Sequence, residues 1–254
     1  MNIKLKPIDL QNQIEIVEKL VKIQEIIDLR KKQISQMDEL IQAKFVEMFG
    51  LPEQKNYPEK TLVEIAKNSK YSIKRGPFGG SLKKEEFVEK GYLVYEQKHV
   101  IQNDFQYEKY YISEKKYKEM EMFKVEPGDL LISCSGTLGK IAEVPENAKE
   151  GIINQALLKV SLNPQIMNNI YFITLFRNEQ IQNLLFGCSR GSGISNFPSM
   201  TEIKKLKFLC PPIEKQKQFQ YMVESIEKSE ESLKNNLKEM EKIQESLMSQ
   251  YFEE

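Results

Sequence analysis

The sequence has few of the residues that build metal centres, disulfide frameworks and hydrolytic triads. Its 254 residues include one histidine, three cysteines and no tryptophan. Cys134, Cys188 and Cys210 lie far apart without a C-x-x-C pair, which argues against structural zinc and against a disulfide framework. His99 is the single histidine available as a general base, and a lone histidine is more often a packing or surface residue. A triad enzyme is therefore not expected.

The sequence also lacks an excess of charge and a long apolar run. Lys plus Arg (37) equals Asp plus Glu (37), so a uniformly basic nucleic-acid-binding chain is excluded. No run approaches the roughly 18 apolar residues of a membrane span, and residues 1–22 are charged throughout. We expect a cytoplasmic protein without a membrane partner. With 40% hydrophobic residues, the chain is long enough to bury a sizeable core.

Two segments without glycine or proline, 10–49 and 213–252, are typical of long amphipathic helices. At 1.5 Å per residue each helix would be about 60 Å long, so each needs a partner along its length. Because both segments adjoin the same central region, we expect them to pair as an antiparallel coiled coil. The heptad rows that predict this pairing are Leu20, Ile27, Ile34, Ile41 and Met48 in the first segment, and Phe219, Ile226, Leu233, Met240 and Leu247 in the second.

The two helical segments also contain an internal repeat. Residues 7–14 (PIDLQNQI) match residues 212–219 (PIEKQKQF). A long helical hairpin alone does not require such a repeat. The repeat favours two related structural units that flank one domain.

The central segment, 51–211, contains glycines, prolines and aromatic residues between short apolar runs. We therefore predict an α+β fold with domain boundaries at 1–50, 51–211 and 212–254. The spacing of Ser199 and Glu202 indicates a capping box at the start of a short helix. The other predicted elements of the centre are strands at 91–95, 130–133, 141–144 and 152–162 and a helix at 169–186.

Two glycine-rich basic segments are candidates for contact with DNA. Residues 65–84 contain six lysine and arginine residues and no acidic residue, and residues 190–196 resemble them in composition. Glycines let a backbone approach a phosphate closely, while serine and asparagine reach base edges. A solvated loop is the alternative for each segment. The predicted contacts are Lys70, Lys74, Arg75, Gly79, Gly80, Ser81, Lys83 and Lys84 from the first segment, and Arg190, Ser192 and Asn196 from the second.

The usual catalytic motifs are absent or incomplete. The glycines at 191–193 lack the third glycine of a dinucleotide fingerprint, and 76–83 is not a phosphate-binding P-loop. Glu96 and Lys98 imitate the end of a nuclease motif, but no aspartate occurs in residues 66–95. Residues 163–165 (NPQ) fail the motif with which amino-methyltransferases hold a flipped adenine. We therefore expect a binding protein without catalytic or metal-ligating residues, and a standalone nuclease or a coiled-coil adaptor is the alternative.

Several stretches of the chain resemble the specificity (S) subunits of type I restriction-modification systems. The resemblance covers nearly the whole chain and depends on the order and spacing of the stretches. They are 61–66 (TLVEIA), 75–83 (RGPFGGSLK), 125–133 (VEPGDLLIS), 136–142 (GTLGKIA), 153–157 (INQAL) and 211–216 (PPIEKQ).

The resemblance implies that the central segment is a target recognition domain that reads one half of a bipartite site in double-stranded DNA. The helices would set the spacing and dock the methyltransferase (M) and restriction (R) subunits. S-adenosylmethionine, ATP and Mg would then belong to those partners, and this chain would carry no cofactor. Complete S subunits have two recognition domains, whereas this chain has one. The resemblance therefore implies a half-length form that pairs with a second copy or with another S half.

Overall fold

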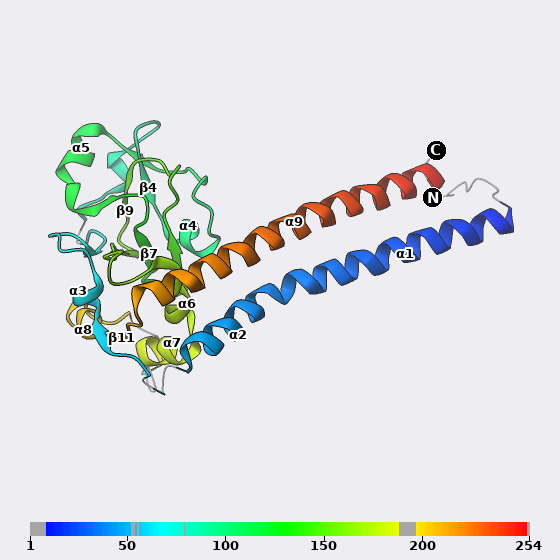
Figure 1. The fold of residues 1–254 in the computed structure, drawn as a ribbon. Helices are drawn as coiled ribbons and strands as arrows, with labels where there is room; N and C mark the ends of the chain where they lie inside the picture. The colour runs from blue at the N-terminus through cyan, green and yellow to red at the C-terminus, as the bar shows by residue number, and fades with distance from the viewer. Residues whose placement is uncertain (1–8, 52–53, 55, 79, 188–196, 253–254) are drawn as a thin grey trace. The chain divides into compact units, whose positions relative to one another are not determined.

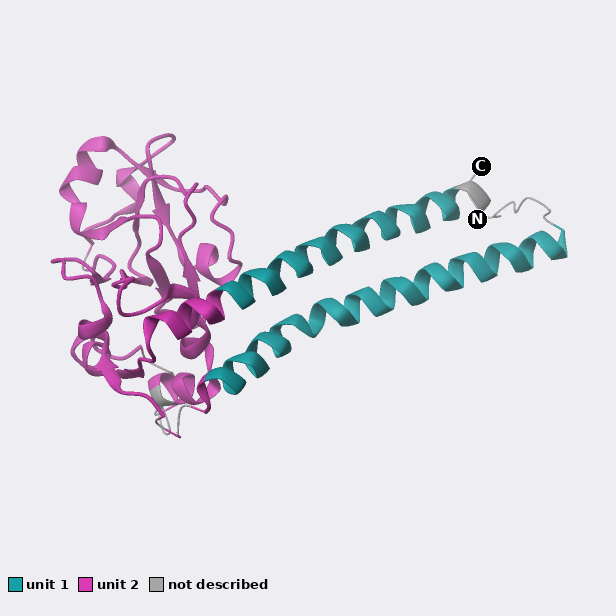
Figure 2. Ribbon diagram, in the orientation of Figure 1, with its two compact units in different colours: residues 1–48, 221–254 teal, residues 49–220 magenta. Residues whose placement is uncertain are grey.

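The computed structural model describes residues 9–51, 54, 56–78, 80–187 and 197–252 (Figure 1). The chain divides into two compact units (Figure 2). Unit 1 comprises residues 1–48 and 221–254, and unit 2 comprises residues 49–220. Within the described residues, no helix combines the length and the apolar character needed to cross a bilayer.

Unit 1 is an antiparallel pair of long helical segments. Lys31 Nζ lies 3.0 Å from Glu241 Oε1, and Gln244 Nε2 donates to Gln24 Oε1 at 2.8 Å, so the residue numbers run in opposite directions along the pair. Every residue of the two predicted heptad rows is buried or half-buried. The predicted fold, α+β with two long antiparallel helices, is confirmed. The helices are α1 (Leu10–Ser35), α2 (Met37–Phe49) and α9 (Ile213–Phe252).

The first helical segment differs from the prediction in one respect. The expected continuous helix over 10–49 is interrupted at Gln36, whose backbone N–H donates to the carbonyls of both Lys32 and Gln33. Shared hydrogen bonds of this kind are common at a helix end. At the other end of α1, Asp9 acts as the N-cap and accepts from the backbone N–H of Asn12 at 3.0 Å.

The described strands of unit 2 form three sheets. The two-stranded sheet pairs β1 (Glu59–Thr61) with β11 (Lys207–Leu209). The antiparallel four-stranded sheet has the order β2 (Ile73–Arg75), β10 (Leu157–Val160), β7 (Leu130–Ser133) and β8 (Ile141–Glu143). The five-stranded sheet has the order β3 (Phe87–Val88), β5 (Tyr111–Ile112), β4 (Tyr92–Tyr95), β9 (Gly151–Ile153) and β6 (Lys124–Val125), and its β4–β9 pair is parallel.

The described part of unit 2 also contains six short α-helices and two 3-10 helices, η2 (Lys84–Glu86) and η3 (Glu121–Phe123). The predicted capping box is confirmed, because Ser199 Oγ accepts from Glu202 N and the Glu202 side chain accepts from Ser199 N. The α-helices are α3 (Leu62–Ile65), α4 (Gln97–Ile101), α5 (Glu114–Glu119), α6 (Asn169–Arg177), α7 (Glu179–Phe186) and α8 (Met200–Lys205).

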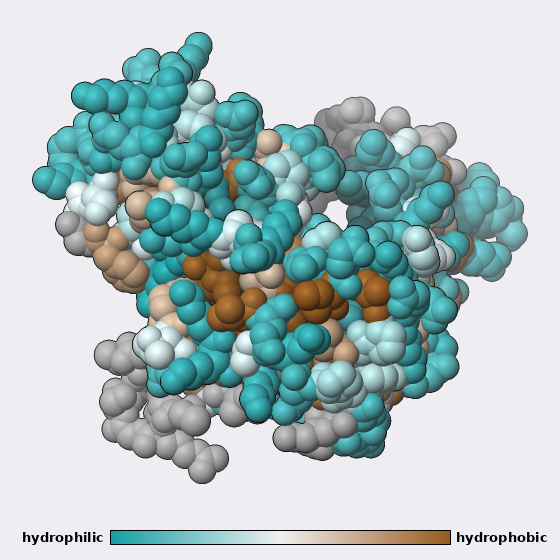
Figure 3. Space-filling view, turned by 60° about the vertical axis from the view of Figure 1, so that its left-hand side comes forward, coloured by the Kyte–Doolittle hydropathy of each residue, from teal (hydrophilic) through white to brown (hydrophobic). Residues whose placement is uncertain are grey.

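Both larger sheets are covered on two faces. In β4, Leu93 and Tyr95 belong to a cluster shared with the four-stranded sheet, while Val94 belongs to a cluster with α5. This division follows from the alternation of side chains along a strand. The opposite face of the four-stranded sheet meets Phe172 and Phe176 of α6 around a small apolar cavity. Figure 3 shows a mainly hydrophilic surface on which apolar residues gather in one band.

Two predicted elements of the centre are wrong in extent. The expected strand 152–162 is two strands, β9 and β10, which belong to different sheets and are separated by a turn. In that turn Asn154 Oδ1 accepts from Ala156 N at 3.0 Å. The expected helix 169–186 is likewise two helices, and Asn178 caps the second one. The predicted strands at 91–95, 130–133 and 141–144 are confirmed by β4, β7 and β8 within one residue at either end.

The start of α9 is anchored in unit 2 by a buried glutamine. The Gln216 side chain is fully buried, and its Nε2 donates to the Ile166 and Pro211 carbonyls at 3.1 and 2.7 Å. Its Oε1 accepts from Asn168 N at 2.8 Å. Because a buried amide is costly unless its donors and acceptor are satisfied, this position requires glutamine. The Pro-Pro-Ile-Glu-Lys-Gln stretch therefore has a structural explanation.

A buried ionic network fixes the turn before β7. Asp129 Oδ2 lies 3.6 Å from Lys159 Nζ and accepts from Glu126 N at 2.9 Å, while Asp129 Oδ1 accepts from Ser161 Oγ. Lys159 Nζ also donates to the Lys124 carbonyl at 2.6 Å. Asp129 is 1% exposed and Lys159 is 7% exposed, so neither charge is compensated by water.

We predict that Asp129→Ala destabilises the chain by about 3–5 kcal/mol, because it leaves the Lys159 ammonium buried without its counter-ion. Urea unfolding of the full chain, followed by circular dichroism, measures the loss. The matched control is Glu114→Ala, which breaks the solvent-exposed pair with Lys118 and should leave stability near that of the wild type. Equal stability of the two variants would contradict the prediction.

Candidate nucleic-acid interface

Four loops of unit 2 meet at one edge of its two larger sheets, which we call the loop edge. Its residues are 76–84 after β2, 96–97 after β4, 134–140 after β7 and the turn 154–156 between β9 and β10.

Backbone hydrogen bonds connect these loops through the turn at 154–156. Asn154 N donates to the Tyr95 carbonyl at 3.0 Å, and Cys134 N donates to the Ala156 carbonyl at 2.7 Å. Gly76 N donates to the Leu157 carbonyl at 2.8 Å. A side chain at Gly76 would put Cβ 1.8 Å from the Asn154 carbonyl oxygen, so only glycine permits this approach. The stretches 75–83, 125–133 and 153–157 are therefore joined into one framework.

The structure places Lys74 and Arg75 on opposite faces of β2. Lys74 pairs across the ladder with Lys159, and its ammonium lies 5.0 Å from the Phe123 ring centre. Arg75 pairs with Leu158, and its guanidinium carbon lies 4.8 Å from the Phe78 ring centre. Both side chains are half-buried. Sequence reasoning treated these two cations as one patch, but successive strand residues point to opposite faces.

The other described residues of the first basic segment lie on the surface. Lys70 is exposed, and its ammonium lies 5.1 Å from the Tyr71 ring centre. Its pKa is raised by a hydrogen bond with Tyr71, so it is charged at neutral pH. Gly80, Ser81, Lys83 and Lys84 are also exposed. The remaining predicted contacts, Gly79, Arg190, Ser192 and Asn196, lie outside the described residues.

Arg75 also contacts an aromatic residue that is distant in the sequence. Its guanidinium carbon lies 5.2 Å from the ring centre of Phe197, the residue that follows the second segment in the chain. Phe197 also packs against Phe186 of α7 with the ring centres 5.7 Å apart. Arg75 Nε is buried without a hydrogen-bond partner among the described residues, and the guanidinium lies against the rings of both Phe78 and Phe197.

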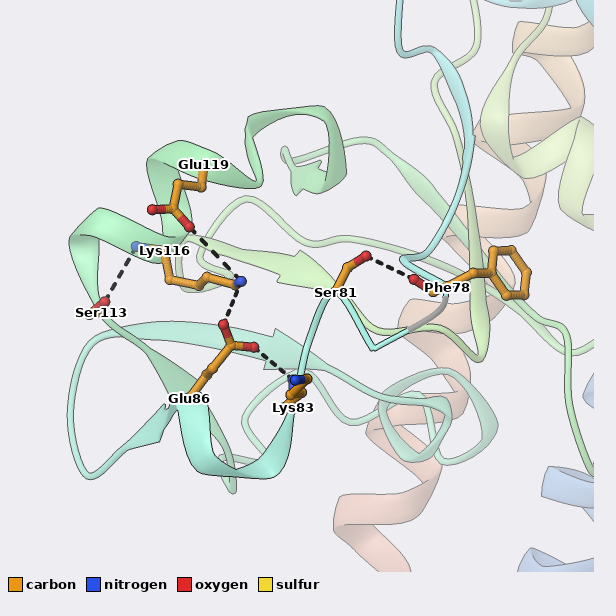
Figure 4. A network of polar contacts seen from close by, with 7 residues as sticks. All are labelled: Phe78, Ser81, Lys83, Glu86, Ser113, Lys116 and Glu119. Carbon is orange, nitrogen blue, oxygen red and sulfur yellow. Dashed lines mark hydrogen bonds and ion pairs between the residues drawn. The ribbon is translucent and has the colours of Figure 1, made fainter.

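The loop after β2 is held at both ends by polar contacts (Figure 4). Ser81 Oγ donates to the Phe78 carbonyl at 2.8 Å. Lys83 N donates to Glu86 Oε2 at 2.7 Å, and Glu86 Oε1 lies 2.6 Å from Lys116 Nζ of α5. These contacts lower the pKa of Glu86 through Lys116 first and the Lys83 backbone second. Glu86 is therefore ionised within the fold, and the side chain of Lys83 is exposed to solvent.

Sequence reasoning missed the neutral polar residues of the loop edge. Ser135, Thr137 and Gln155 are exposed there, and Gln97 Nε2 donates to the Ser135 carbonyl. Hydroxyl and amide groups can read base edges in a groove. For Ser135 and Thr137, the signal that could have found them is their position shortly after the predicted strand 130–133. Gln155 gave no such signal, because it falls inside the predicted strand 152–162.

Neither His99 nor Cys134 is placed for catalysis. His99 is fully buried, its Nδ1 accepts from Glu96 N at 2.9 Å, and its Nε2 donates to the Tyr107 carbonyl at 2.8 Å. Of the two roles expected for a lone histidine, packing or surface, the structure shows packing. Burial raises the pKa of the Cys134 thiol to about 12, so it is protonated at neutral pH. Among the described residues, no group of three His, Cys, Asp or Glu side chains is arranged to hold a metal ion.

A family model described as "Type I restriction modification DNA specificity domain" matches residues 78–242, which is more than half of the chain. The chain belongs to this family. The resemblance predicted from the ordered stretches is therefore confirmed. Specificity subunits are the non-catalytic members of their complexes, in agreement with the expectation that this chain is not an enzyme.

Solved structures of specificity subunits have the same fold. The HsdS subunit from Thermoanaerobacter tengcongensis is 15% identical, with a TM-score of 0.61 over 94% of this chain and 56% of that chain. A chain from a structure on "complex assembly" and "conformational transition of the type I R-M system" is 14% identical, with a TM-score of 0.66 over 95% of this chain and 58% of that chain. This chain therefore covers less than two thirds of the length of either of these two neighbours. The comparison with curated proteins gave no match.

We predict that Cys134 of the native specificity domain resists alkylation by iodoacetamide at pH 8, because the thiolate is the reactive form and burial suppresses it. Alkylation followed by peptide mass spectrometry should show modification of Cys134 only after unfolding in urea. Rapid modification of the native chain would contradict the buried environment and would reopen a nucleophilic role.

Proposed function

We propose that this chain is the DNA-recognition subunit of a type I restriction-modification complex. Residues 51–211 form its target recognition domain, which reads one half of a bipartite site in double-stranded DNA. Residues 1–50 and 212–254 set the spacing and dock the methyltransferase and restriction subunits. The observation that carries this proposal is the match of a DNA specificity domain to residues 78–242.

The chemistry of the loop edge supports DNA as the ligand. Lys83 and Lys84 are exposed cations close in the chain to glycine, where no side chain keeps a ligand away from the backbone. Exposed cations and backbone N–H groups are typical contacts for phosphates. Ser135, Thr137 and Gln155 supply neutral donors and acceptors beside them. Phosphate contacts fix the register of a protein on the duplex, and contacts to base edges specify sequence. The loop edge offers both kinds of group.

The partners supply the catalysis in this proposal. Methylation of adenine with S-adenosylmethionine belongs to the M subunits, and cleavage driven by ATP with Mg belongs to the R subunit, all in the cytoplasm. A structural neighbour whose title describes the assembly of a type I R-M system supports these partners. The recognition subunit itself carries no cofactor.

A second copy of the chain supplies the other recognition domain in this proposal. Four apolar residues of α1 recur at spacings of four, three and four residues and yet remain exposed. These residues are Leu10, Ile14, Val17 and Val21. Leu10 is 72% exposed and Val17 is 56% exposed. The rows that face α9 do not include these residues. This exposed stripe has the pattern of a coiled-coil seam and fits another helix.

We predict that co-expression with the cognate M subunit, in a host without adenine methylation, produces one methylated sequence motif. Single-molecule sequencing of the genome maps the modified bases. A palindromic, interrupted motif is expected from two copies related by a two-fold axis. An asymmetric motif would mean that another S half replaces the second copy. Methylation without sequence dependence by a stable complex would overturn the proposed function.

We predict that Lys83→Ala and Lys84→Ala each weaken DNA binding and reduce the salt slope, d log K/d log[salt], by about one unit. Fluorescence anisotropy of the complex with a labelled duplex, over a range of salt concentrations, measures this slope. Lys118→Ala is the matched control, because its ammonium is exposed but paired with Glu114. Unchanged slopes for all three variants would favour a coiled-coil adaptor that does not contact DNA through this loop.

A further inference from the structure

Phe78 stands out among the aromatic residues of unit 2. Among the phenylalanines whose burial the structure describes, which leaves out Phe252, it alone is mainly exposed, at 59%. A single exposed apolar residue is ordinary on a protein surface. Here, however, the residue lies on the loop edge, and three features of its surroundings give it a defined position and a defined electrostatic environment.

The first feature is a backbone that holds the residue in place. Gly76 and Pro77 are buried, and the close approach of Gly76 to the Asn154 carbonyl fixes where the loop leaves β2. The Phe78 carbonyl accepts from both Oγ and N of Ser81, at 2.8 and 3.4 Å. Figure 4 shows the Phe78 ring pointing away from the network around Glu86. The ring is therefore presented to solvent by an anchored backbone.

The second feature is the cation beneath the ring. The Arg75 guanidinium carbon lies 4.8 Å from the ring centre, and Arg75 Nε has no hydrogen-bond partner. A guanidinium held against an aromatic ring strengthens that ring's attachment to the domain. It also places a positive charge directly behind the exposed apolar surface.

The third feature is the charge of the segment. Residues 65–84 include no acidic residue, and Lys83 and Lys84 are exposed a few residues beyond Phe78. An exposed apolar ring in a cationic surrounding suits a ligand that is polyanionic and that carries apolar surfaces. Duplex DNA has this combination, since its phosphates are anionic and the faces of its bases are apolar.

We propose that Phe78 inserts between two neighbouring base pairs of the bound duplex and kinks it, while Arg75 and the loop lysines neutralise the flanking phosphates. The proposal rests on the proposed function and adds a means of recognition to it. Unstacking costs least at pyrimidine–purine steps such as TA and CA/TG. The wedge therefore selects a deformable step without a hydrogen bond to either base.

The test uses the complex of this chain with its M subunit and a duplex that carries the mapped motif. Fluorescence energy transfer between the duplex ends reports bending. The base analogue 2-aminopurine, placed at each position other than the methylated adenine, reports local unstacking. The wild type should bend the duplex and brighten the analogue at one pyrimidine–purine step. Phe78→Ala should abolish both signals and weaken binding about tenfold or more, the value of one stacked base. Phe78→Leu, which keeps an apolar wedge, should retain part of the bend.

Matched controls separate the possible outcomes. Val63→Ala truncates another exposed apolar side chain, which is 55% exposed and lies on α3 outside the loop edge, and it should leave bending and affinity unchanged. Wild-type bending and affinity in Phe78→Ala would overturn the wedge and leave the proposed function intact. Loss of M-subunit binding in Phe78→Ala, with DNA bending retained by the remaining complex, would also overturn it and assign Phe78 to a protein contact. A wild-type complex that binds no duplex specifically would overturn both proposals.

Discussion

The two larger sheets are held to each other by a turn of three residues. The turn 154–156 connects β9 of one sheet to β10 of the other, and its backbone groups bond to Tyr95 at the end of β4 and to Cys134 after β7. Gly76 approaches the same turn closely enough to exclude any side chain. The positions of all the loops at this edge therefore depend on one short piece of backbone. Because a backbone contact is insensitive to most side-chain changes, the framework tolerates variation in the loops that it supports.

Sequence patterns predicted the elements that can be identified from their own pattern of apolar side chains. The heptad rows of α1, α2 and α9 and the apolar runs of β4 and β7 required no knowledge of their partners. The patterns failed where one apolar run serves two sheets, as at β9 and β10, because the turn between them is set by the Asn154 side chain. They also missed strands of two residues such as β3 and β6, which are too short to show an alternating pattern in the sequence.

For the candidate site, composition singled out a loop that the structure places at the surface, but it did not show the directions of the side chains. The absence of acidic residues singled out 65–84, and most of its cations are exposed. Sequence could not show that Lys74 and Arg75 point to opposite faces, because β2 has only three residues and no recognisable period. Nor could it show that Phe197 lies against Arg75, a contact between residues more than a hundred positions apart. Sequence alone would place Lys159 on the surface, because it does not show that Asp129 lies beside this lysine.

The division between buried supports and exposed side chains at the loop edge has a consequence for evolution. Gly76, Asp129 and Ser133 hold the framework from within, whereas Ser81, Ser135, Thr137 and Gln155 face solvent. Substitution of exposed residues away from caps and buried networks usually changes stability by less than about 0.5 kcal/mol. A lineage carrying this domain can therefore alter the exposed side chains one at a time without passing through an unfolded intermediate.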